Sequence, residues 1–223
     1  MKTVRILSTK KLQPNQRQFL LNAGFSVIEA DFLSIRLKKF ELPVIGDSLI
    51  FTSANAVKSV LQNSRLEELR RRPCICVGSK TKALLEENGF TVVESEENAT
   101  ALGKKIVENH RGSSFTFFAG NLRLETLPDL LERSGITFNE VQVYETVLVP
   151  QKVETECDGI LFFSPSGVQS FLRSNSIVSQ VCFCIGDTTA KALERTTKHI
   201  VIAKKSTVEN VIIQCINHFN KQT

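Results

Sequence analysis

Short apolar runs alternate with helical patterns along this chain, and small polar residues stand where one gives way to the other. The clearest case is Gly159 to Leu172, GILFFSPSGVQSFL, where an apolar run leads through Ser-Pro-Ser-Gly into a helical pattern. The stretch SLIFTSANAVKSVL, which starts at Ser48, has the same pattern 111 positions earlier. Both stretches predict a buried strand that leads directly into a helix, and together they indicate an internal repeat.

The repeat extends over nearly the whole chain. Gly24 and Gly135, which are also 111 positions apart, are both suited to a left-handed helix end. Strands that alternate with helices predict parallel sheets covered on both faces. We therefore expect an α/β fold of two similar doubly wound parallel-sheet domains, related by internal duplication. The predicted strands include residues 4–8, 25–30, 91–93, 114–119, 136–143 and 199–202. The predicted helices include residues 99–107 and 208–219, a helix through Leu130 and Leu131, and a helix after Pro14 whose apolar positions include Phe19 and Leu20.

The two strand-to-helix junctions are candidate anion sites. Unpaired N–H groups and the positive end of the helix dipole favour a carboxylate or phosphate at a helix start by about 0.3–1 kcal/mol. Ser53 and Asn55 stand at one junction, and Ser164 and Ser166 at the other. The same residue types commonly do no more than cap a helix, and for either junction alone that simpler interpretation stays open.

Polar residues also gather where other predicted strands end. Ligands of open parallel sheets bind beyond the carboxyl ends of the strands, and a cleft between two domains is a favoured location. Two Gly-x-x-Thr segments, which begin at Gly78 and Gly186, occupy such ends and repeat each other. We therefore expect an active-site cleft between the two domains. The candidate binding residues are Lys10, Ser53, Asn55, Thr81, Asn121, Arg123, Ser164, Ser166, Gly167, Thr188 and Thr189.

Composition and charge narrow the classes of function. The net charge of +5 is compatible with a nucleic-acid surface and equally with a polyanionic small molecule. The only dense basic run, Arg70–Arg72, has no aromatic platform beside it, so we interpret it as a solvated helix end. No G-x-G-x-x-G or Walker loop indicates a nucleotide. No segment approaches a membrane span or a signal peptide, so we expect a cytoplasmic protein.

The cysteines and histidines do not predict a metal centre. Two Cys-x-Cys pairs, Cys74/Cys76 and Cys182/Cys184, are again repeats. Alternate residues of a strand share a face, so each pair is interpreted as two small apolar residues on one side of a sheet. A four-cysteine zinc site is the weaker alternative, because zinc ligand pairs favour Cys-x2-Cys spacing. The three histidines are expected at the surface.

Six segments resemble, in order, those of the uroporphyrinogen-III synthase family of tetrapyrrole biosynthesis: IFTSANAV, CVGSKT, AGNLRLETLPDLL, VQVYET, ILFFSPSGV and CIGDTTAKAL. The likeness runs from about Val4 to about Ile213. It implies that the chain starts in one domain, builds all of the second and returns to the first. The implied division is residues 1–34 with 149–223, residues 41–143, and a two-stranded linker of 35–40 and 144–148.

The resemblance also implies a reaction that needs no cofactor. Linear hydroxymethylbilane loses water to give an azafulvenium cation, which closes through a spiro intermediate into a macrocycle whose last ring is inverted. Tyr144, the only tyrosine, matches a recurrent tyrosine of the family and would donate a hydrogen bond to the departing hydroxyl; packing of the hinge is its other interpretation. Thr81 and Thr189 match family threonines, and Ser164 and Ser166 match the second junction.

Two other classes of function stay open on sequence alone. One is a non-catalytic two-domain protein that holds a tetrapyrrole or another polycarboxylate without converting it. A nucleic-acid-binding protein is a more distant alternative. The expected partner is thus a small-molecule polycarboxylate, with no nucleic acid, no membrane and no metal, and we expect the protein to act as a monomer.

Overall fold

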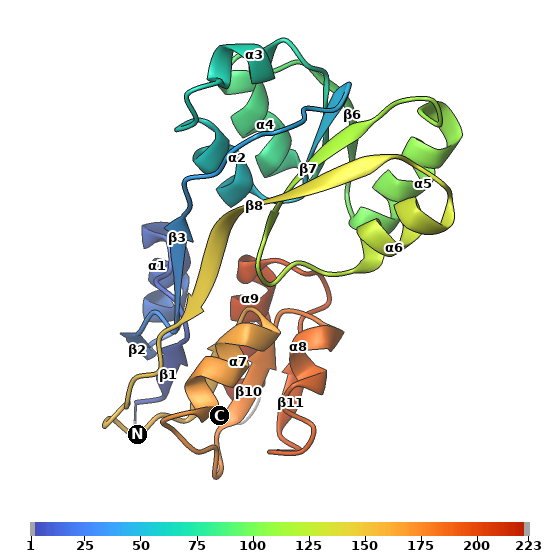
Figure 1. The fold of residues 1–223 in the computed structure, drawn as a ribbon. Helices are drawn as coiled ribbons and strands as arrows, with labels where there is room; N and C mark the ends of the chain where they lie inside the picture. The colour runs from blue at the N-terminus through green and yellow to red at the C-terminus, as the bar shows by residue number, and fades with distance from the viewer. Residues whose placement is uncertain (1–2, 221–223) are drawn as a thin grey trace. The chain divides into compact units, whose positions relative to one another are not determined.

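The computed structural model describes residues 3–220 and divides the chain into two compact units. Met1–Ser34 and Val147–Thr223 form the first unit, and Ile35–Thr146 the second. The chain passes between the units in two strands, β3 (Leu33–Leu37) and β8 (Phe138–Leu148). Strands alternate with helices throughout both units (Figure 1), which confirms the α/β class predicted from the sequence.

The first unit is a parallel sheet with helices on both faces. Its elements are β1 (Arg5–Ser8), α1 (Pro14–Asn22), β2 (Ser26–Glu29), β9 (Gly159–Phe162), α7 (Pro165–Leu172), β10 (Val181–Cys184), α8 (Asp187–Lys191), β11 (Ile200–Ile202) and α9 (Val208–Asn220). The strand order is β11-β10-β9-β1-β2, and all four pairings are parallel. The order therefore reverses between β1 and β9, which is where open α/β sheets bind ligands.

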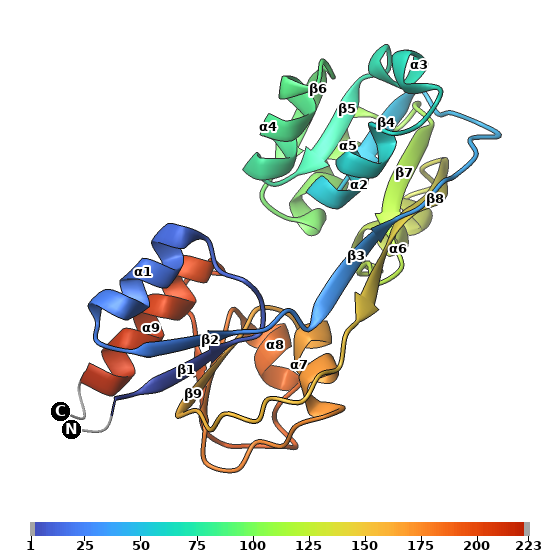
Figure 2. The same ribbon diagram turned by 90° about the vertical axis from the view of Figure 1, so that its left-hand side faces the viewer.

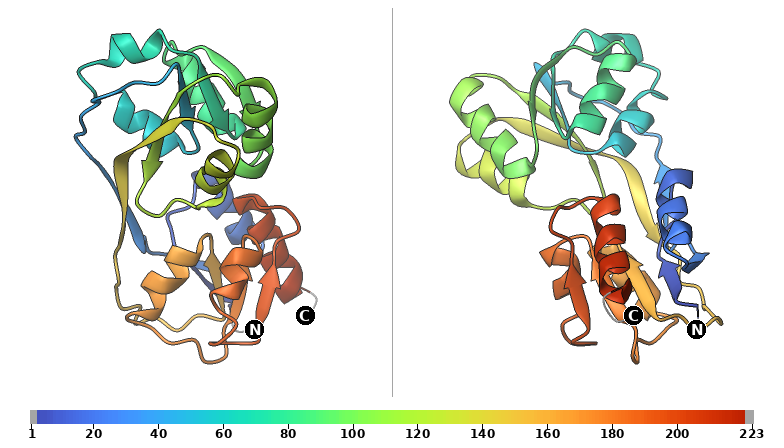
Figure 3. Two further views of the ribbon diagram at one scale, coloured as in Figure 1. Left: turned by 45° about the vertical axis from the view of Figure 1, so that its right-hand side comes forward. Right: turned by 180° about the vertical axis from the view of Figure 1, so that it is seen from behind.

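Alternating side chains of these strands build two cores, one on each face of the sheet. Ile6, Leu161 and Phe183 pack with apolar residues of α1 and α9. Their neighbours in the chain, such as Leu7 and Phe162, pack instead with α7 and α8. Figures 2 and 3 show α1 and α9 side by side on one face of this sheet. The unit is thus doubly wound, as the sequence predicts.

The second unit repeats this arrangement with one additional strand. Its remaining elements are β4 (Ser48–Phe51), α2 (Ala54–Val60), α3 (Leu66–Arg70), β5 (Cys74–Val77), α4 (Ser79–Glu87), β6 (Val92–Glu96), α5 (Ala99–Asn109), β7 (Phe115–Gly120) and α6 (Thr126–Arg133). Strands β8-β7-β4-β5-β6 are parallel, in the spatial order of β2-β1-β9-β10-β11 in the first unit. Helices α5 and α6 cover one face, and α2 and α4 the other.

The additional strand, β3, pairs with β8 at the edge of the sheet. The Lys38 N–H donates to the Val143 carbonyl at 2.9 Å, and the Val149 N–H donates to the Phe32 carbonyl at 2.9 Å. Residue numbers rise in one strand as they fall in the other, so the pairing is antiparallel. This pairing carries β8 to Leu148, beyond the strand end predicted at residue 143, because residues 144–148 find a partner that the local sequence does not reveal.

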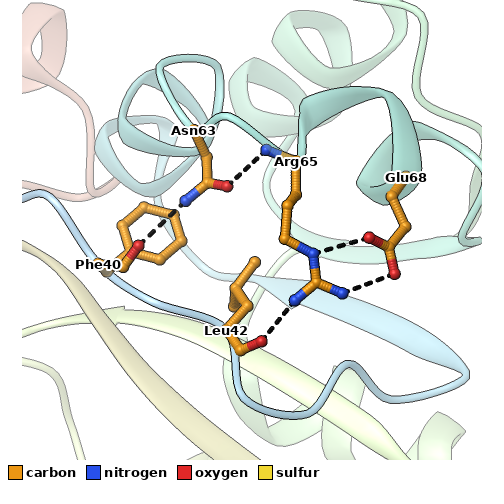
Figure 4. Close-up of polar contacts among 5 residues, drawn as sticks. All are labelled: Phe40, Leu42, Asn63, Arg65 and Glu68. Carbon is orange, nitrogen blue, oxygen red and sulfur yellow. Dashed lines mark hydrogen bonds and ion pairs between the residues drawn. The ribbon is translucent and has the colours of Figure 1, made fainter.

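Two side chains hold the irregular segment between β3 and β4 against the loop after α2 (Figure 4). The Asn63 amide donates to the Phe40 carbonyl at 3.2 Å and accepts from the Arg65 N–H at 2.9 Å. The Arg65 guanidinium donates to the Leu42 carbonyl and forms a two-point ion pair with Glu68 at 2.7 and 2.8 Å. These bonds satisfy backbone carbonyls that no strand partner reaches.

The cysteine pairs are core residues, as predicted. Cys74 and Cys76 belong to one apolar cluster, and Cys182 and Cys184 to another, so each pair faces one side of its sheet. Burial raises the pKa of the Cys184 thiol to about 12. Within residues 3–220, no three His, Cys, Asp or Glu side chains gather in a way that could hold a metal ion.

Some local expectations need correction. Phe19, expected on the apolar face of α1, is 57% exposed, whereas Leu20 is fully buried, because the helix turns Phe19 away from the core. His218 is not a plain surface residue, since its ring packs edge-on against Phe183 with centroids 5.6 Å apart. Across the described residues, no helix has the length and apolar character needed to cross a bilayer.

Candidate functional site

In the first unit, predicted site residues meet where β1 and β9 end. These strands are parallel neighbours, so the loops that follow them are adjacent. The Thr9 hydroxyl donates to the Leu161 carbonyl at 2.7 Å, which fixes the end of β1 against β9. The Lys10 ammonium lies 4.6 Å from the centre of the Phe163 ring. Lys10 is thus held beside the β9–α7 junction by a cation–π contact.

Two serines organise the start of α7. The Gly167 N–H donates to the Ser164 hydroxyl at 3.0 Å, which caps the helix. The Ser166 hydroxyl lies 3.1 Å from the Ser164 hydroxyl, so the two side chains are hydrogen-bonded. A Cβ on Gly167 would lie 3.3 Å from that same Ser164 oxygen. The capping prediction is confirmed, and Ser166 adds a second hydroxyl at the same helix start.

The neighbouring β10–α8 loop contributes two threonines with different environments. Thr188 is exposed, whereas Thr189 is 1% exposed. The Thr189 hydroxyl makes no hydrogen bond to any residue that the structure describes. A buried hydroxyl without a partner costs about 1–3 kcal/mol, so a ligand that offered an acceptor here would relieve that cost.

In the second unit, the β4–α2 and β5–α4 junctions have the corresponding positions. Ser53 caps α2 by accepting from the Asn55 N–H at 3.2 Å. The Asn55 side chain is half-buried and has no hydrogen bond within residues 3–220. Thr81 is buried in the first turn of α4, which follows Gly78 with its left-handed φ of 86°. These polar groups lie at the carboxyl ends of adjacent strands β4 and β5.

Tyr144 lies against the end of β7. Its ring is so close to Gly120 that a Cβ on this glycine would stand 2.3 Å from the ring carbon that bears the hydroxyl. Gly120 pairs with Tyr144 across the two parallel strands, and β7 is also paired with β4. Within the second unit the phenol therefore belongs to the strand ends that Ser53 and Asn55 follow.

Asn121 and Arg123, two further predicted site residues, are engaged within the second unit. The Asn121 amide donates to the Thr146 carbonyl at 3.2 Å and accepts from its N–H at 2.8 Å. Arg123 lies 2.6 Å from each of two carboxylates, those of Glu140 and Glu125. The hydrogen bond to Glu140 is the main cause that raises the pKa of Arg123. A substrate carboxylate would have to compete with these partners.

Two residues outside the predicted site set belong to these strand ends. Thr9 lies beside Gly167, because a Cβ there would come within 3.9 Å of the Thr9 hydroxyl. Gly120 accommodates Tyr144. Both residues could have been included in the predicted site because each stands at the end of a predicted strand. The contact between Gly120 and the Tyr144 ring could not be predicted, because 24 residues separate them in the sequence.

Fold and site together define a class: an α/β protein of two sheets with the same strand order, each with hydroxyl-rich loops beyond its strand ends. The family model for "Uroporphyrinogen-III synthase HemD" matches residues 20–213. The chain therefore belongs to the uroporphyrinogen-III synthase family.

Curated relatives agree with this assignment. The chain is 28% identical over 221 residues to "Uroporphyrinogen-III synthase" of Chlorobaculum parvum, an alignment of 87% of this chain and 89% of that protein. It is 26% identical over 153 residues to "Porphyrin biosynthesis protein HemD" of Ruminiclostridium josui, covering 61% of this chain and 30% of that longer protein.

Two crystal structures share the fold. Uroporphyrinogen-III synthetase of Helicobacter pylori matches with a TM-score of 0.78 at 22% identity, over 97% of this chain and all of that one. A mutant uroporphyrinogen III synthase of Thermus thermophilus matches with a TM-score of 0.65 at 13% identity, over 99% of this chain and all of that one.

Proposed function

We infer that this chain is an enzyme, a uroporphyrinogen-III synthase of haem biosynthesis. It closes hydroxymethylbilane to uroporphyrinogen III, with loss of water and inversion of the last ring. The observation that carries the activity is the family match over residues 20–213. The strand-end loops described above, which both units carry, support the same conclusion because the substrate is a polycarboxylate.

The reaction depends more on holding the substrate in one conformation than on strong catalytic groups. When the terminal hydroxyl departs as water, the remaining azafulvenium cation is stabilised by its own pyrrole. The Tyr144 phenol would donate a hydrogen bond to that departing hydroxyl. The protein then has to hold the cation so that it attacks the substituted carbon, because unassisted closure gives the uninverted isomer. Holding reactants in one geometry can account for about 7–11 kcal/mol of a barrier.

The substrate carboxylates would be held by the strand-end residues. A charge-assisted hydrogen bond contributes about 1.5–3 kcal/mol, so a few such bonds suffice to fix a flexible chain. Arg123 would contribute only by exchanging its present partners, whereas Asn121 would use the second N–H of its amide and keep its bonds to Thr146. The proposed binding residues in the first unit are Lys10, Ser164, Ser166, Gly167, Thr188 and Thr189, and those in the second are Ser53, Asn55 and Thr81.

The proposal extends to where and how the protein works. The six cysteines are all unpaired thiols, which suits the reducing cytoplasm. No step of the proposed mechanism needs a cofactor, a nucleic acid or a second copy of the chain. We therefore propose a monomeric cytoplasmic enzyme.

Product analysis tests the proposal. Purified protein receives freshly generated hydroxymethylbilane, and the oxidised products are separated by isomer on a column. The expected result is type III isomer at a rate proportional to protein concentration. Type I isomer alone, at the spontaneous rate, would refute the synthase function; if the protein then still bound a linear tetrapyrrole, the non-catalytic binding protein would replace it.

A further inference from the structure

We propose that Gly120 is a positioning residue for Tyr144, and that a bulge in β8 and the Asn121 side chain complete the seat of its ring. The inference rests on the function proposed above, in which the Tyr144 hydroxyl donates to the departing hydroxyl group. All of the residues involved belong to the second unit. The role of Gly120 lies in the space that it leaves, because it presents no side chain to the ring.

The contact between Gly120 and the Tyr144 ring leaves no room for a methyl group. A Cβ on Gly120 would stand 2.3 and 2.5 Å from two ring carbons and 2.8 Å from the phenol oxygen. Contacts of a Cβ below 3.0 Å essentially do not occur. Gly120 is not among the glycines with positive φ in residues 3–220, so its backbone would accept alanine. Glycine is required here because the Tyr144 ring leaves no space for a Cβ, and not because of the backbone conformation.

A bulge in β8 aims Tyr144 at this space. Ala119 pairs with Gln142, but the next residue of β7, Gly120, pairs with Tyr144, so Val143 is an extra residue in β8. A bulge redirects the side chains that follow it. In a regular strand Val143 and Tyr144 would point to opposite faces. Here both pack against the same apolar cluster, and Tyr144 crosses the end of β7.

The Asn121 amide holds β8 two residues beyond Tyr144. Its two hydrogen bonds with the backbone of Thr146, at 2.8 and 3.2 Å, imitate the pairing of a strand after β7 has ended. The position of the phenol is therefore fixed by three features: the space left by Gly120, the bulge in β8 at Val143, and the hydrogen bonds of Asn121 to Thr146. An acid must be held to within about 0.5 Å of its productive position, so we expect the loss of any of these restraints to lower its efficiency.

The test substitutes Gly120→Ala and compares it with Gly112→Ala. Gly112 lies in the same unit, has no positive φ and has no atom within 4 Å of a Cβ, so it is a matched control. We expect Gly120→Ala to lower kcat about ten- to a hundredfold, as misplacement by about 1 Å can do, with little change in KM. Gly112→Ala should keep the activity of the parent protein.

Quenching of tyrosine fluorescence distinguishes displacement of the Tyr144 ring from general damage to the fold. The chain has one tyrosine and no tryptophan, so its intrinsic fluorescence comes from Tyr144 alone. We expect acrylamide to quench this fluorescence more strongly in Gly120→Ala than in Gly112→Ala or the parent protein, because the displaced ring becomes more accessible. Unchanged quenching together with unchanged kcat would overturn the proposed seat.

Double variants test separately whether Gly120 positions the Tyr144 ring and whether the Tyr144 hydroxyl assists the reaction. In a Tyr144→Phe background, Gly120→Ala should cause no further loss of kcat, because no hydroxyl remains to be misplaced. Two full, multiplying losses would show that Gly120 acts independently of the phenol. A fully active Tyr144→Phe protein would refute the catalytic role of the hydroxyl, whereas the quenching result would still decide whether Gly120 seats the ring.

Stability provides the measurement if Gly120→Ala folds poorly. Tyr144→Ala removes the atoms with which the new methyl group collides. The variant that combines Gly120→Ala with Tyr144→Ala should therefore unfold at a higher temperature than Gly120→Ala alone. If truncating the ring restores nothing, the collision with Tyr144 is not the reason for glycine at this position, and the proposal fails.

Discussion

Thr189 has a buried hydroxyl at the start of a short helix, in the loop that we propose binds a substrate carboxylate. Its oxygen has no hydrogen-bond partner within residues 3–220. The fold therefore bears the cost of burying a polar group, about 1–3 kcal/mol, without compensation. A substrate carboxylate would supply the missing acceptor, which makes Thr189 the residue at which binding can be separated most cleanly from stability.

We predict that Thr189→Val lowers kcat/KM about ten- to a hundredfold, the equivalent of one charge-assisted hydrogen bond. The free energy of unfolding should stay the same or rise, because valine has nearly the same shape and no unsatisfied hydroxyl. Steady-state kinetics and urea unfolding measure the two quantities. An unchanged kcat/KM would remove Thr189 from the binding site.

Thr116→Val is the matched control. The Thr116 hydroxyl is also buried, but it accepts from the Gly46 N–H and donates to Asn139, both at 2.9 Å. It belongs to the first half of β7, away from the end that carries Gly120. Its replacement should cost about 1–3 kcal/mol of stability and leave kcat/KM close to that of the parent protein, the reverse of the Thr189→Val result.

At the scale of single residues, the sequence predicts those contacts that are made between residues close together in the chain. Ser53 and Ser164 are recognisable as helix caps because the N–H groups that they accept from follow within three residues. The environment of Arg123, which lies in the loop after β7, is not recognisable, since its main partner, Glu140, is 17 residues away in β8. A charge that appears free in the sequence is paired in the fold.

At the scale of elements, the two Gly-x-x-Thr junctions are alike in sequence but not in backbone. Gly78 has φ 86° and ψ 141°, a region that is open essentially to glycine alone. Gly186 is extended, with φ −178°. A Cβ there would meet the Ser206 hydroxyl at 3.4 Å, an ordinary contact. The duplicated loops have therefore diverged in how their helices begin.

This divergence predicts opposite responses to the same substitution. Gly78→Ala should lower the free energy of unfolding by about 1–3 kcal/mol, because alanine is strained at that φ and ψ. Gly186→Ala should change it by less than about 0.5 kcal/mol, as is usual for substitutions that meet no such feature. Denaturant unfolding of the two variants measures the difference. Equal effects would contradict the assigned backbone conformations.

Most strands and helices could be predicted because their apolar patterns are local. The runs in β4 and β9 are continuous and buried along their whole length, as central parallel strands require. The length of β8 could not be predicted, because its last residues are stabilised by pairing with β3, about a hundred residues earlier in the chain. The bulge before Tyr144 could not be predicted either, because it lies in the pairing of β8 with β7, which is also non-local.

At the scale of the whole molecule, the repeat alone does not say how the chain is divided. An offset of 111 positions is equally compatible with two tandem halves. The resemblance implied that the ends of the chain fold together, and contacts group Met1–Ser34 with Val147–Thr223. Repetition thus predicts two similar sheets, but the order in which the chain builds them has no local signature.

The unequal burial of the six thiols gives a test of the folded state as a whole. Cys157 is partly exposed and the other five are buried. Burial, and secondarily Asp158, raises the pKa of Cys157 to about 11. In the native protein we predict slow reaction of a single thiol with Ellman's reagent, at a rate that rises as pH approaches 11, because only the thiolate reacts.

Two comparisons complete the thiol measurement. Cys157→Ser should abolish the native reaction, and unfolding in guanidinium chloride should expose all six thiols of the parent protein. Rapid native labelling of the Cys74/Cys76 or Cys182/Cys184 pair would contradict their assignment to the cores.

The central claim is that the scaffold directs ring closure and that the Tyr144 hydroxyl assists departure of the leaving group. The most direct test measures both the rate and the isomer of the product formed by Tyr144→Phe. We predict a kcat about ten- to a hundredfold lower, at or below the low end of the range for positioned acids, with type III still the enzyme-dependent product. Complete loss of type III formation by a correctly folded variant would contradict the claim that steering does most of the work.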